Sequence, residues 1–180
     1  MHGIIHAELQ RFVQQNYGHE AWHTMLRRAG LDAEVYTPLQ AYPDSHIMAL
    51  VQEAVAMTKI DAKQLLEAFG EFLVPTYLGV YGSLVKRDWR TLDVLEHTEE
   101  TIHTVVRSRQ KGALPPKLKV RRTSNREVLI TYNSERRLCA VARGIVRGVA
   151  KNFQEEVRIT DIRCMHLGDP TCVISVALRK

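Results

Sequence analysis

The spacing of hydrophobic residues changes along this chain, and the change limits the folds it can adopt. Up to about residue 110 these residues recur every three or four positions, as Ile5, Leu9, Phe12 and Val13 do, which is typical of amphipathic helices. Beyond Pro116 they alternate in short β-branched segments. The pattern predicts an α+β fold with a helical N-terminal half and a C-terminal antiparallel ββαββ unit.

Glycine and proline indicate where the helices end. Two helices should end at Gly18 and Gly30, and a third should run from about Ser45 to Met57. Asp61 and Gln64 resemble a capping box that opens a fourth helix, which Pro75 should kink or end. A fifth should run from Thr91 to about Gln110, with a stop at Lys111, Gly112 and the pair Pro115-Pro116.

The C-terminal half contains two expected hairpins and one long helix. The first hairpin pairs Leu118–Arg122 with Val128–Tyr132, and the second pairs Val157–Arg163 with Cys172–Leu178. Between them Leu138–Phe153 has the clearest amphipathic pattern in the chain. Gly144 and Gly148, four residues apart on this helix, indicate the close approach of another backbone.

Composition excludes several classes of protein. The chain has 180 residues, which fits one domain spanning 1–180. No segment has the ~20 apolar residues of a membrane span, and Glu8 argues against a secretory signal. Three cysteines cannot all pair with one another, so a disulfide scaffold is not expected. We expect a cytoplasmic protein with no membrane partner.

Basic residues are concentrated in one segment. Residues 107–137 contain ten Lys or Arg and two Glu, so this segment carries +8 and the rest of the chain −3. The excess fits nucleic acid, an anionic ligand or a solvated basic face, and the sequence alone leaves these alternatives open.

One histidine of the eight has an unusual setting. His103 lies among Ile102, Val105 and Val106, and helical spacing places it near Glu99. The ordinary alternative is a core histidine bonded to a backbone carbonyl. Five others should be solvated, because they lie near termini, on polar faces or beside polar neighbours: His2, His19, His23, His46 and His97.

A short donor motif follows the second expected strand. In an extended segment Tyr132, Ser134 and Arg136 project to one side, where a phenol, a hydroxyl and a guanidinium suit a carboxylate or a phosphate.

At this point the sequence resembles the haem nitric oxide/oxygen-binding family, the H-NOX domains. The resemblance rests on Met1-His2-Gly3-Ile4-Ile5, residues 65–70, His103, Pro115-Pro116 and Tyr132-Ser134-Arg136, which match in order and spacing over essentially the whole chain. It implies a buried haem b between the two halves of the α+β fold. By the same resemblance His103 is the proximal iron ligand, Tyr132, Ser134 and Arg136 hold the haem propionates, and Ile5 and Pro116 distort the porphyrin.

The resemblance also implies the residues that face a bound gas. Leu73, Tyr77 and Val141 would line the distal side, and Val141 occupies the position of the tyrosine that oxygen-binding members use as a hydrogen-bond donor. We therefore expect binding of nitric oxide and carbon monoxide without a stable oxygen complex. Tyr77 is the exception to test, because its hydroxyl could turn inward.

A second group of residues has metal-ligand chemistry. Cys139, Cys164, His166 and Cys172 could meet across the second hairpin, although their spacing is not that of a standard zinc finger and three buried hydrophobes are the plain alternative. A subgroup of the family carries zinc on three cysteines placed like these. Asp161 stands where that subgroup has a histidine, so the resemblance implies Asp161, or else His166, as the fourth zinc ligand.

The sequence is therefore interpreted as a gas sensor without catalytic activity. The resemblance implies a switch in which nitric oxide weakens the link between iron and His103, and a partner that is a separate histidine kinase or a cyclic-di-GMP enzyme, namely a diguanylate cyclase or phosphodiesterase. Two alternatives remain: a basic nucleic-acid-binding module, which the resemblance does not lead us to expect, and a haem enzyme of the peroxidase type, for which Leu73 and Val141 supply no acid or base.

Overall fold

The computed structural model describes residues 1–109 and 113–179. Its helices are α1 (Gly3–Tyr17), α2 (His19–Arg28), α3 (Asp44–Thr58), α4 (Ala62–Tyr81), α5 (Thr91–His97), α6 (Thr104–Arg109) and α7 (Cys139–Asn152), with short turns η1 (Gly82–Leu84), η2 (Glu99–His103) and η3 (Met165–Leu167). Its strands are β1 (Lys117–Ser124), β2 (Glu127–Asn133), β3 (Val157–Arg163) and β4 (Cys172–Leu178). The expected α+β class is confirmed. Among the described residues no helix is both long and apolar enough to cross a membrane.

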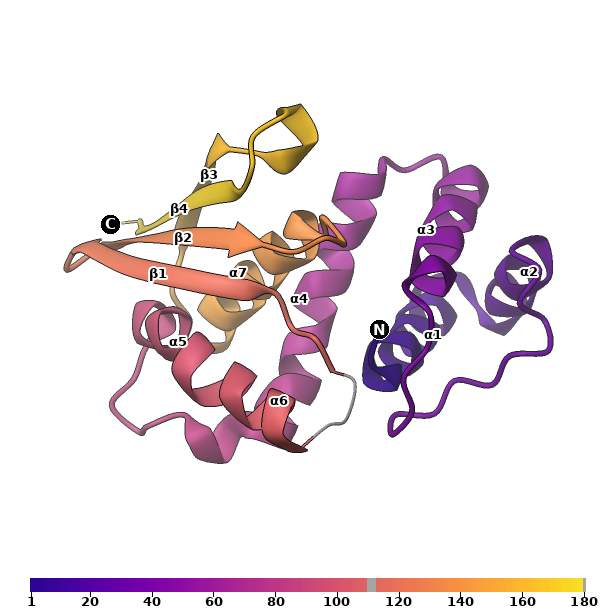
Figure 1. The fold of residues 1–180 in the computed structure, drawn as a ribbon, viewed down its shortest axis with the longest axis horizontal. Coiled ribbons are helices and arrows are strands. Elements are labelled where there is room, and N and C mark those ends of the chain that lie inside the picture. The colour runs from indigo at the N-terminus through magenta and orange to yellow at the C-terminus, as the bar shows by residue number, and fades with distance from the viewer. Residues whose placement is uncertain (110–112, 180) are drawn as a thin grey trace.

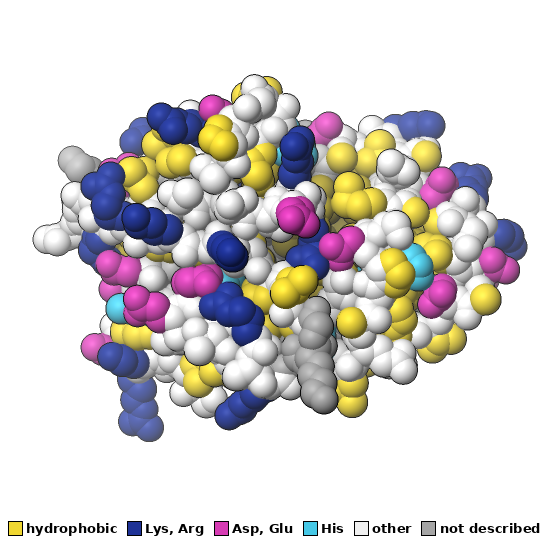
Figure 2. Space-filling model, viewed as in Figure 1, with side chains coloured by type: hydrophobic (Ala, Val, Ile, Leu, Met, Phe, Trp, Pro, Cys, Tyr) yellow, Lys and Arg dark blue, Asp and Glu magenta, His cyan; other side chains and the backbone are white. Residues whose placement is uncertain are grey.

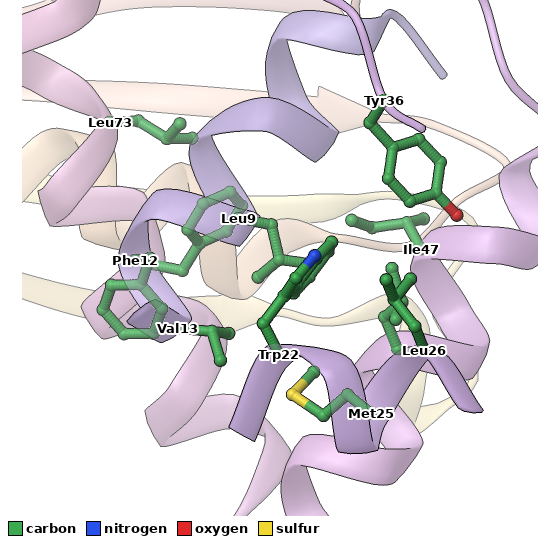
Figure 3. Packing of buried hydrophobic residues seen from close by; sticks show 11 residues of the cluster. Leu9, Phe12, Val13, Trp22, Met25, Leu26, Tyr36, Ile47 and Leu73 are labelled. Carbon is green, nitrogen blue, oxygen red and sulfur yellow. The ribbon is translucent and has the colours of Figure 1, made fainter. Parts of the chain in front are cut away.

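Three helices, α1 to α3, form one side of the molecule, and the sheet forms the other (Figure 1). The helical core buries the apolar faces that the sequence predicted, and Figure 3 shows how their side chains interlock: Leu9, Phe12 and Val13 from α1, Trp22, Met25 and Leu26 from α2, and Ile47 from α3. Gly18 ends α1 at φ +87°, a conformation that glycine adopts without steric cost. The helix ends predicted from glycine are therefore confirmed on this side.

Helices α4 and α7 lie between the two sides and touch backbone to backbone. A Cβ on Gly144 would lie 2.0 Å from the carbonyl oxygen of Glu67, and one on Gly70 would lie 2.2 Å from that of Val141. The close approach expected at Gly144 is thus confirmed. Asp61 caps α4 by accepting hydrogen bonds from the amides of Lys63 and Gln64.

Pro75 does not end α4, which continues to Tyr81. Proline removes one helical hydrogen bond, the one that the carbonyl of Glu71 would accept. That part of α4 packs closely on α7, where a Cβ on Gly148 would lie 2.9 Å from the Glu71 carbonyl oxygen and 2.5 Å from Val74 Cγ2. Tertiary packing therefore holds the helix together across the proline.

The single helix expected from Thr91 to about Gln110 is instead divided into α5, η2 and α6. The division is a π-helical turn, in which the amide of His103 donates to the carbonyl of Thr98, five residues earlier, at 3.0 Å. Single π turns occur frequently at functional sites. The expected stop at Lys111 and Gly112, with Gln110 before it, lies outside the described residues.

The four strands form one antiparallel sheet in the order β1-β2-β4-β3. The two hairpin pairings are confirmed, but they are joined because β4 lies between β2 and β3. Side chains that alternate along β2 and β4 are buried on the inner face: Val128, Ile130, Tyr132, Cys172, Ile174 and Val176. Helix α5 and helix α7 pack on this inner side, which places the second core beside α4.

Candidate functional site

An apolar cavity of about 270 Å³ lies between the helical side and the inner face of the sheet. Its walls come from α1, α4, α7 and the strands, and from the α5 to α6 segment on the other side. Eight residues singled out from the sequence line it: Ile5, Tyr77, His103, Pro116, Tyr132, Ser134, Arg136 and Val141. The fold thus brings together residues from positions 5 to 141 around one pocket.

Leu73 is the member of the expected set that does not line this cavity. It is completely buried in the helical core, where Figure 3 shows it beside α1. The neighbouring residue Val74 lines the cavity instead. The contact of Gly70 with α7 sets the rotation of α4, and one residue along a helix changes the direction of a side chain by about 100°.

His103 reaches the cavity from the end of the π turn. Its Nδ1 lies 2.8 Å from Oε2 of Glu99, the partner that the four-residue spacing predicted. A carboxylate only accepts hydrogen bonds, so Nδ1 carries the proton of the neutral ring and Nε2 is its unprotonated nitrogen. Burial lowers the pKa of His103, while Glu99 acts in the opposite direction. The ring is therefore a neutral, oriented imidazole, which is the form that binds metals.

Glu99 joins three parts of the structure. Besides His103, it accepts hydrogen bonds from the backbone amide of Leu118 at 3.1 Å and from Nη2 of Arg107 at 2.7 Å. Burial opposes its ionisation, but these hydrogen bonds outweigh burial and lower its pKa. The ionised carboxylate consequently connects the histidine with strand β1 and with helix α6.

Tyr132, Ser134 and Arg136 lie together at the cavity, as their alternate spacing predicted. Arg136 donates from Nε to Asp44 at 2.7 Å and from Nη1 to the carbonyl of Leu114 at 2.6 Å. Burial raises the pKa of Tyr132 to about 12, so its hydroxyl stays protonated and can donate. A phenol, a hydroxyl and a guanidinium beside an apolar cavity suit a ligand that has an apolar body and an anionic edge.

Tyr77, from α4, and Val141, from α7, line the same cavity. Burial raises the pKa of Tyr77, so the phenol is neutral, and its ring lies 6.3 Å from that of Tyr81. Val141 offers no donor. Of the described residues that α4 contributes to the lining, Tyr77 and Tyr81 are the ones whose hydroxyls can donate.

The three cysteines converge outside this cavity. The Sγ atoms of Cys139, Cys164 and Cys172 all lie within 4.8 Å of one another, although they come from α7, the end of β3 and the start of β4. All three are free thiols. Burial, together with the neighbouring thiols, raises the pKa of Cys139 to about 12. Their close approach fits the soft-metal chemistry of thiolates.

The two expected fourth ligands have other partners. Asp161 forms ion pairs with Arg143 at 2.5 Å and with Lys63 at 3.3 Å. His166 Nε2 lies 2.7 Å from the backbone carbonyl of Arg137, to which it donates. Within the described chain the group of potential metal ligands therefore consists of the three cysteines.

Sequence reasoning missed His6, which α1 buries completely in the helical core. Neither ring nitrogen has a hydrogen-bond partner among the described residues, and the ring stacks on Tyr36 with centroids 4.5 Å apart. Burial lowers its pKa to about 4. Its spacing of three and seven residues from Leu9 and Val13, both on the buried face of α1, was the available signal.

Of the five histidines expected to be solvated, His19 and His23 are exposed. The other three are half-buried and have partners, which corrects the expectation. His2 caps α1 through the amide of Ile4, His46 bonds the hydroxyl of Tyr36 at 3.1 Å, and His97 stacks on Trp89 at 4.6 Å. Neighbours distant in sequence supply two of these contacts, so local polarity did not reveal them.

The Haem-NO-binding (HNOB) family model matches residues 2–161. Soluble guanylate cyclase gcy-32 from Caenorhabditis elegans is 26% identical in an alignment of 159 residues, which covers 84% of this chain and 23% of that protein. This chain thus spans less than a quarter of the length of that relative. A crystal structure of an H-NOX protein from S. oneidensis in the Fe(II)NO ligation state matches with a TM-score of 0.93 and 25% identity over the whole of both chains.

An NMR structure of an H-NOX domain from Shewanella oneidensis in the Fe(II)CO ligation state is also similar. Its TM-score is 0.89 and its identity 25%, over all of this chain and 99% of that one. Both matches extend over the helical side and the sheet side, including the cavity between them.

Proposed function

This chain belongs to the Haem-NO-binding family, and from that premise we propose that residues 1–180 form one domain that binds haem b in the cavity and senses nitric oxide. H-NOX domains are haem-based gas sensors related to soluble guanylate cyclase. The observation that carries the proposal is His103: a neutral imidazole whose Nδ1 is held by Glu99 and whose ring lines an apolar cavity. Haem held there would supply a ferrous iron that binds diatomic gases.

The donors at the cavity edge would hold the two propionates. Tyr132 and Ser134 would donate from their hydroxyls, and Arg136 from its guanidinium. Arg136 has Asp44 as its ionic partner, so it would share its donors between Asp44 and a propionate. Ile5 and Pro116 would press on the porphyrin from two sides, because both line the cavity.

Gas selection would follow from the side of the cavity that faces away from His103. Val141 offers no donor to a bound oxygen molecule, whereas nitric oxide and carbon monoxide bind ferrous iron without one. Related proteins have been determined with each of these two gases. Oxygen binding would depend on Tyr77, because it lines the same cavity as Val141 and its phenol is neutral.

The output would begin at Glu99. Because Glu99 bonds His103, the amide of Leu118 and the guanidinium of Arg107, a displacement of the His103 ring would be passed through Glu99 to strand β1 and helix α6. A separate histidine kinase, diguanylate cyclase or phosphodiesterase would sense the altered surface. In this proposal the domain itself is a sensor and catalyses no reaction.

We further propose that Cys139, Cys164 and Cys172 hold a structural zinc ion that joins α7 to the β3–β4 hairpin. The support is their mutual distance of at most 4.8 Å and the preference of zinc for thiolates. His166 is now favoured over Asp161 as fourth ligand. To recruit Asp161 two ion pairs must break, whereas to recruit His166 only one hydrogen bond at the surface must break.

Absorption spectra of the purified protein test the sensor function. We expect a haem spectrum that changes on reduction with dithionite and again on addition of nitric oxide. His103→Gly should lose haem unless imidazole is supplied, whereas the exposed control His23→Gly should keep it. A colourless protein, or an unchanged ferrous spectrum in His103→Gly without imidazole, would contradict the proposal.

Oxygen binding is tested separately from nitric oxide. The ferrous protein should form no stable oxygen complex in air. A long-lived oxygen spectrum that disappears in Tyr77→Phe would show that Tyr77 is a donor and that the proposed gas selection is wrong.

A further inference from the structure

The outer face of the sheet carries an ordered set of unpaired cations. Side chains of β1 alternate across the sheet, so Leu118 and Val120 face the cavity while Lys117, Lys119 and Arg121 point outward and are exposed. Figure 2 shows Lys and Arg side chains spread over this side of the molecule. Strand β1, which lies at one border of the sheet, is therefore basic on its outward face.

The register of the four strands places cations at the opposite border as well. Lys119 pairs with Thr131, Thr131 with Val173, and Val173 with Arg163, so this row across the sheet begins and ends with a cation. Arg158, on β3 beside Ala177, adds another cation to the same border. We call the outward surface bordered by Lys117, Lys119, Arg121, Arg158 and Arg163 the basic sheet face.

The centre of the basic sheet face carries short, uncharged side chains. Its half-buried side chains are Leu129, Thr131, Val173, Ser175 and Ala177. Glu127 is the carboxylate on this part of the sheet, and it accepts hydrogen bonds from the hydroxyls of Thr123 at 2.8 Å and Ser175 at 2.6 Å. The centre can thus make close contact with a partner, while the borders supply the charge.

None of the five border cations has an ion pair within the described part of the chain. Arg122, which lies between them in sequence but points inward, has two carboxylate partners, Asp93 and Glu96, at 2.7 Å each. Cations without ion pairs along two borders of one face favour a partner with the complementary charge. Acidic side chains could pair with them without breaking an existing ion pair, and Arg158 acts on Glu127 only through a longer-range electrostatic interaction.

The sheet is one layer thick between this face and the cavity. Leu118, Val120 and Ile130 line the cavity from the inner side of the strands whose outer side forms the basic sheet face. The amide of Leu118, between Lys117 and Lys119, donates to Glu99, which also holds His103. Glu99 alone therefore links a displacement of His103 to the β1 backbone, which carries Lys117 and Lys119.

We propose that the basic sheet face docks a partner protein through Asp and Glu side chains, and that this partner senses the ligand state of the cavity through β1. The proposal rests on the proposed sensor function for its second part. Strand spacing gives a face of about 400 Å², smaller than the ~800 Å² per partner of a stable complex, so the contact is transient. Single-stranded nucleic acid fits less well, because the outward side chains of the four strands include no aromatic ring on which bases stack.

Fluorescently labelled poly-L-glutamate of about 20 residues is the probe, and its binding to the haem-loaded protein is measured by fluorescence anisotropy. We expect Lys119→Glu/Arg163→Glu to weaken binding about tenfold or more. The matched control, Arg27→Glu/Arg28→Glu on α2, makes the same change in net charge far from the sheet and should alter binding less than about twofold. Equal losses in both double variants would show that only net charge matters and would overturn the proposal.

Two further measurements test which class of anionic partner binds this face and whether peptide binding depends on the ligand state of the cavity. A DNA duplex or an anionic phospholipid vesicle that binds the basic sheet face more tightly than the peptide would overturn the assignment to an acidic protein. The peptide should bind the unliganded and nitric oxide-bound states with dissociation constants about threefold or more apart, corresponding to about 0.6 kcal/mol, and equal constants would overturn the coupling. Spectra recorded on the same samples show whether haem and nitric oxide bind at all, so a failure of the sensor function is seen separately.

Discussion

His6 should make the protein less stable in mild acid. Its ring is fully buried between α1 and Tyr36 and has no hydrogen-bond partner among the described residues, so the folded state keeps it neutral. Burial, with a smaller contribution from the N-terminal ammonium, lowers the pKa from 6.5 to about 4. In the unfolded chain the same ring takes up a proton near its ordinary pKa.

The sign and size follow from this difference. Between pH 6.5 and about pH 4 the unfolded state binds more protons than the folded state, so stability is full above this range and falls as the pH decreases through it. The whole shift corresponds to about 3 kcal/mol, of which about 2 kcal/mol is lost at about pH 5.

Urea unfolding followed by circular dichroism at about pH 7.5 and about pH 5 measures this loss. His6→Phe keeps a ring for stacking on Tyr36 but cannot be protonated, so it should lose about 2 kcal/mol less than the unmodified protein between the two pH values. The exposed control His23→Phe should follow the unmodified protein. Parallel losses in the protein and in His6→Phe would refute the reasoning, as would a His6 ring that titrates in the folded protein near pH 6.5 by NMR.

Three other predictions concern the helix contact, the histidine support and the cysteines. Gly144→Ala should lower the free energy of unfolding by about 3 kcal/mol in urea unfolding, because its Cβ would lie 2.0 Å from the Glu67 carbonyl oxygen. The control Gly79→Ala, whose Cβ would have nothing within 4 Å, should be neutral or stabilising. Equal effects of the two variants would contradict the close contact. Glu99→Gln should preserve haem binding but change the frequency of the iron–histidine stretch in resonance Raman spectra, because the Nδ1 proton loses a charged acceptor; an unchanged frequency would argue against its role. Protein purified without added zinc should contain about one equivalent of zinc by elemental analysis, and Cys172→Ser should contain much less. Less than about a tenth of an equivalent of zinc in both proteins would mean that the three cysteines are ordinary buried hydrophobic residues.

Local patterns in the sequence were sufficient for the helices, the strands and several pairs. Helical periodicity depends on side chains three or four residues apart, and for the same reason the contact of His103 with Glu99 was predictable. Alternation along the strand predicted that Tyr132 and Arg136 share one side. Two glycines four residues apart on one helix predicted a close backbone contact, since only glycine allows it.

Contacts between distant segments were decided only by the tertiary structure. Helix α4 remains helical past Pro75 because it packs on α7, and the same contact sets the rotation that turns Leu73 away from the cavity. Neither result follows from the helix propensity of the residues in α4. Arg143 and Lys63 hold Asp161, because α4, α7 and β3 meet there, and this removes it from the cysteines.

Patterns along the chain predicted most of the helices, the strands and the donor motif, because these depend on neighbouring residues, but they missed the π turn that divides the segment from Thr91 to Arg109. Only the tertiary structure brought Cys139, Cys164 and Cys172 together, placed β4 between β2 and β3, and buried His6 without partners. The physical reason is that burial and side-chain partners are set by how whole elements pack, and packing depends on surfaces that are far apart in the chain.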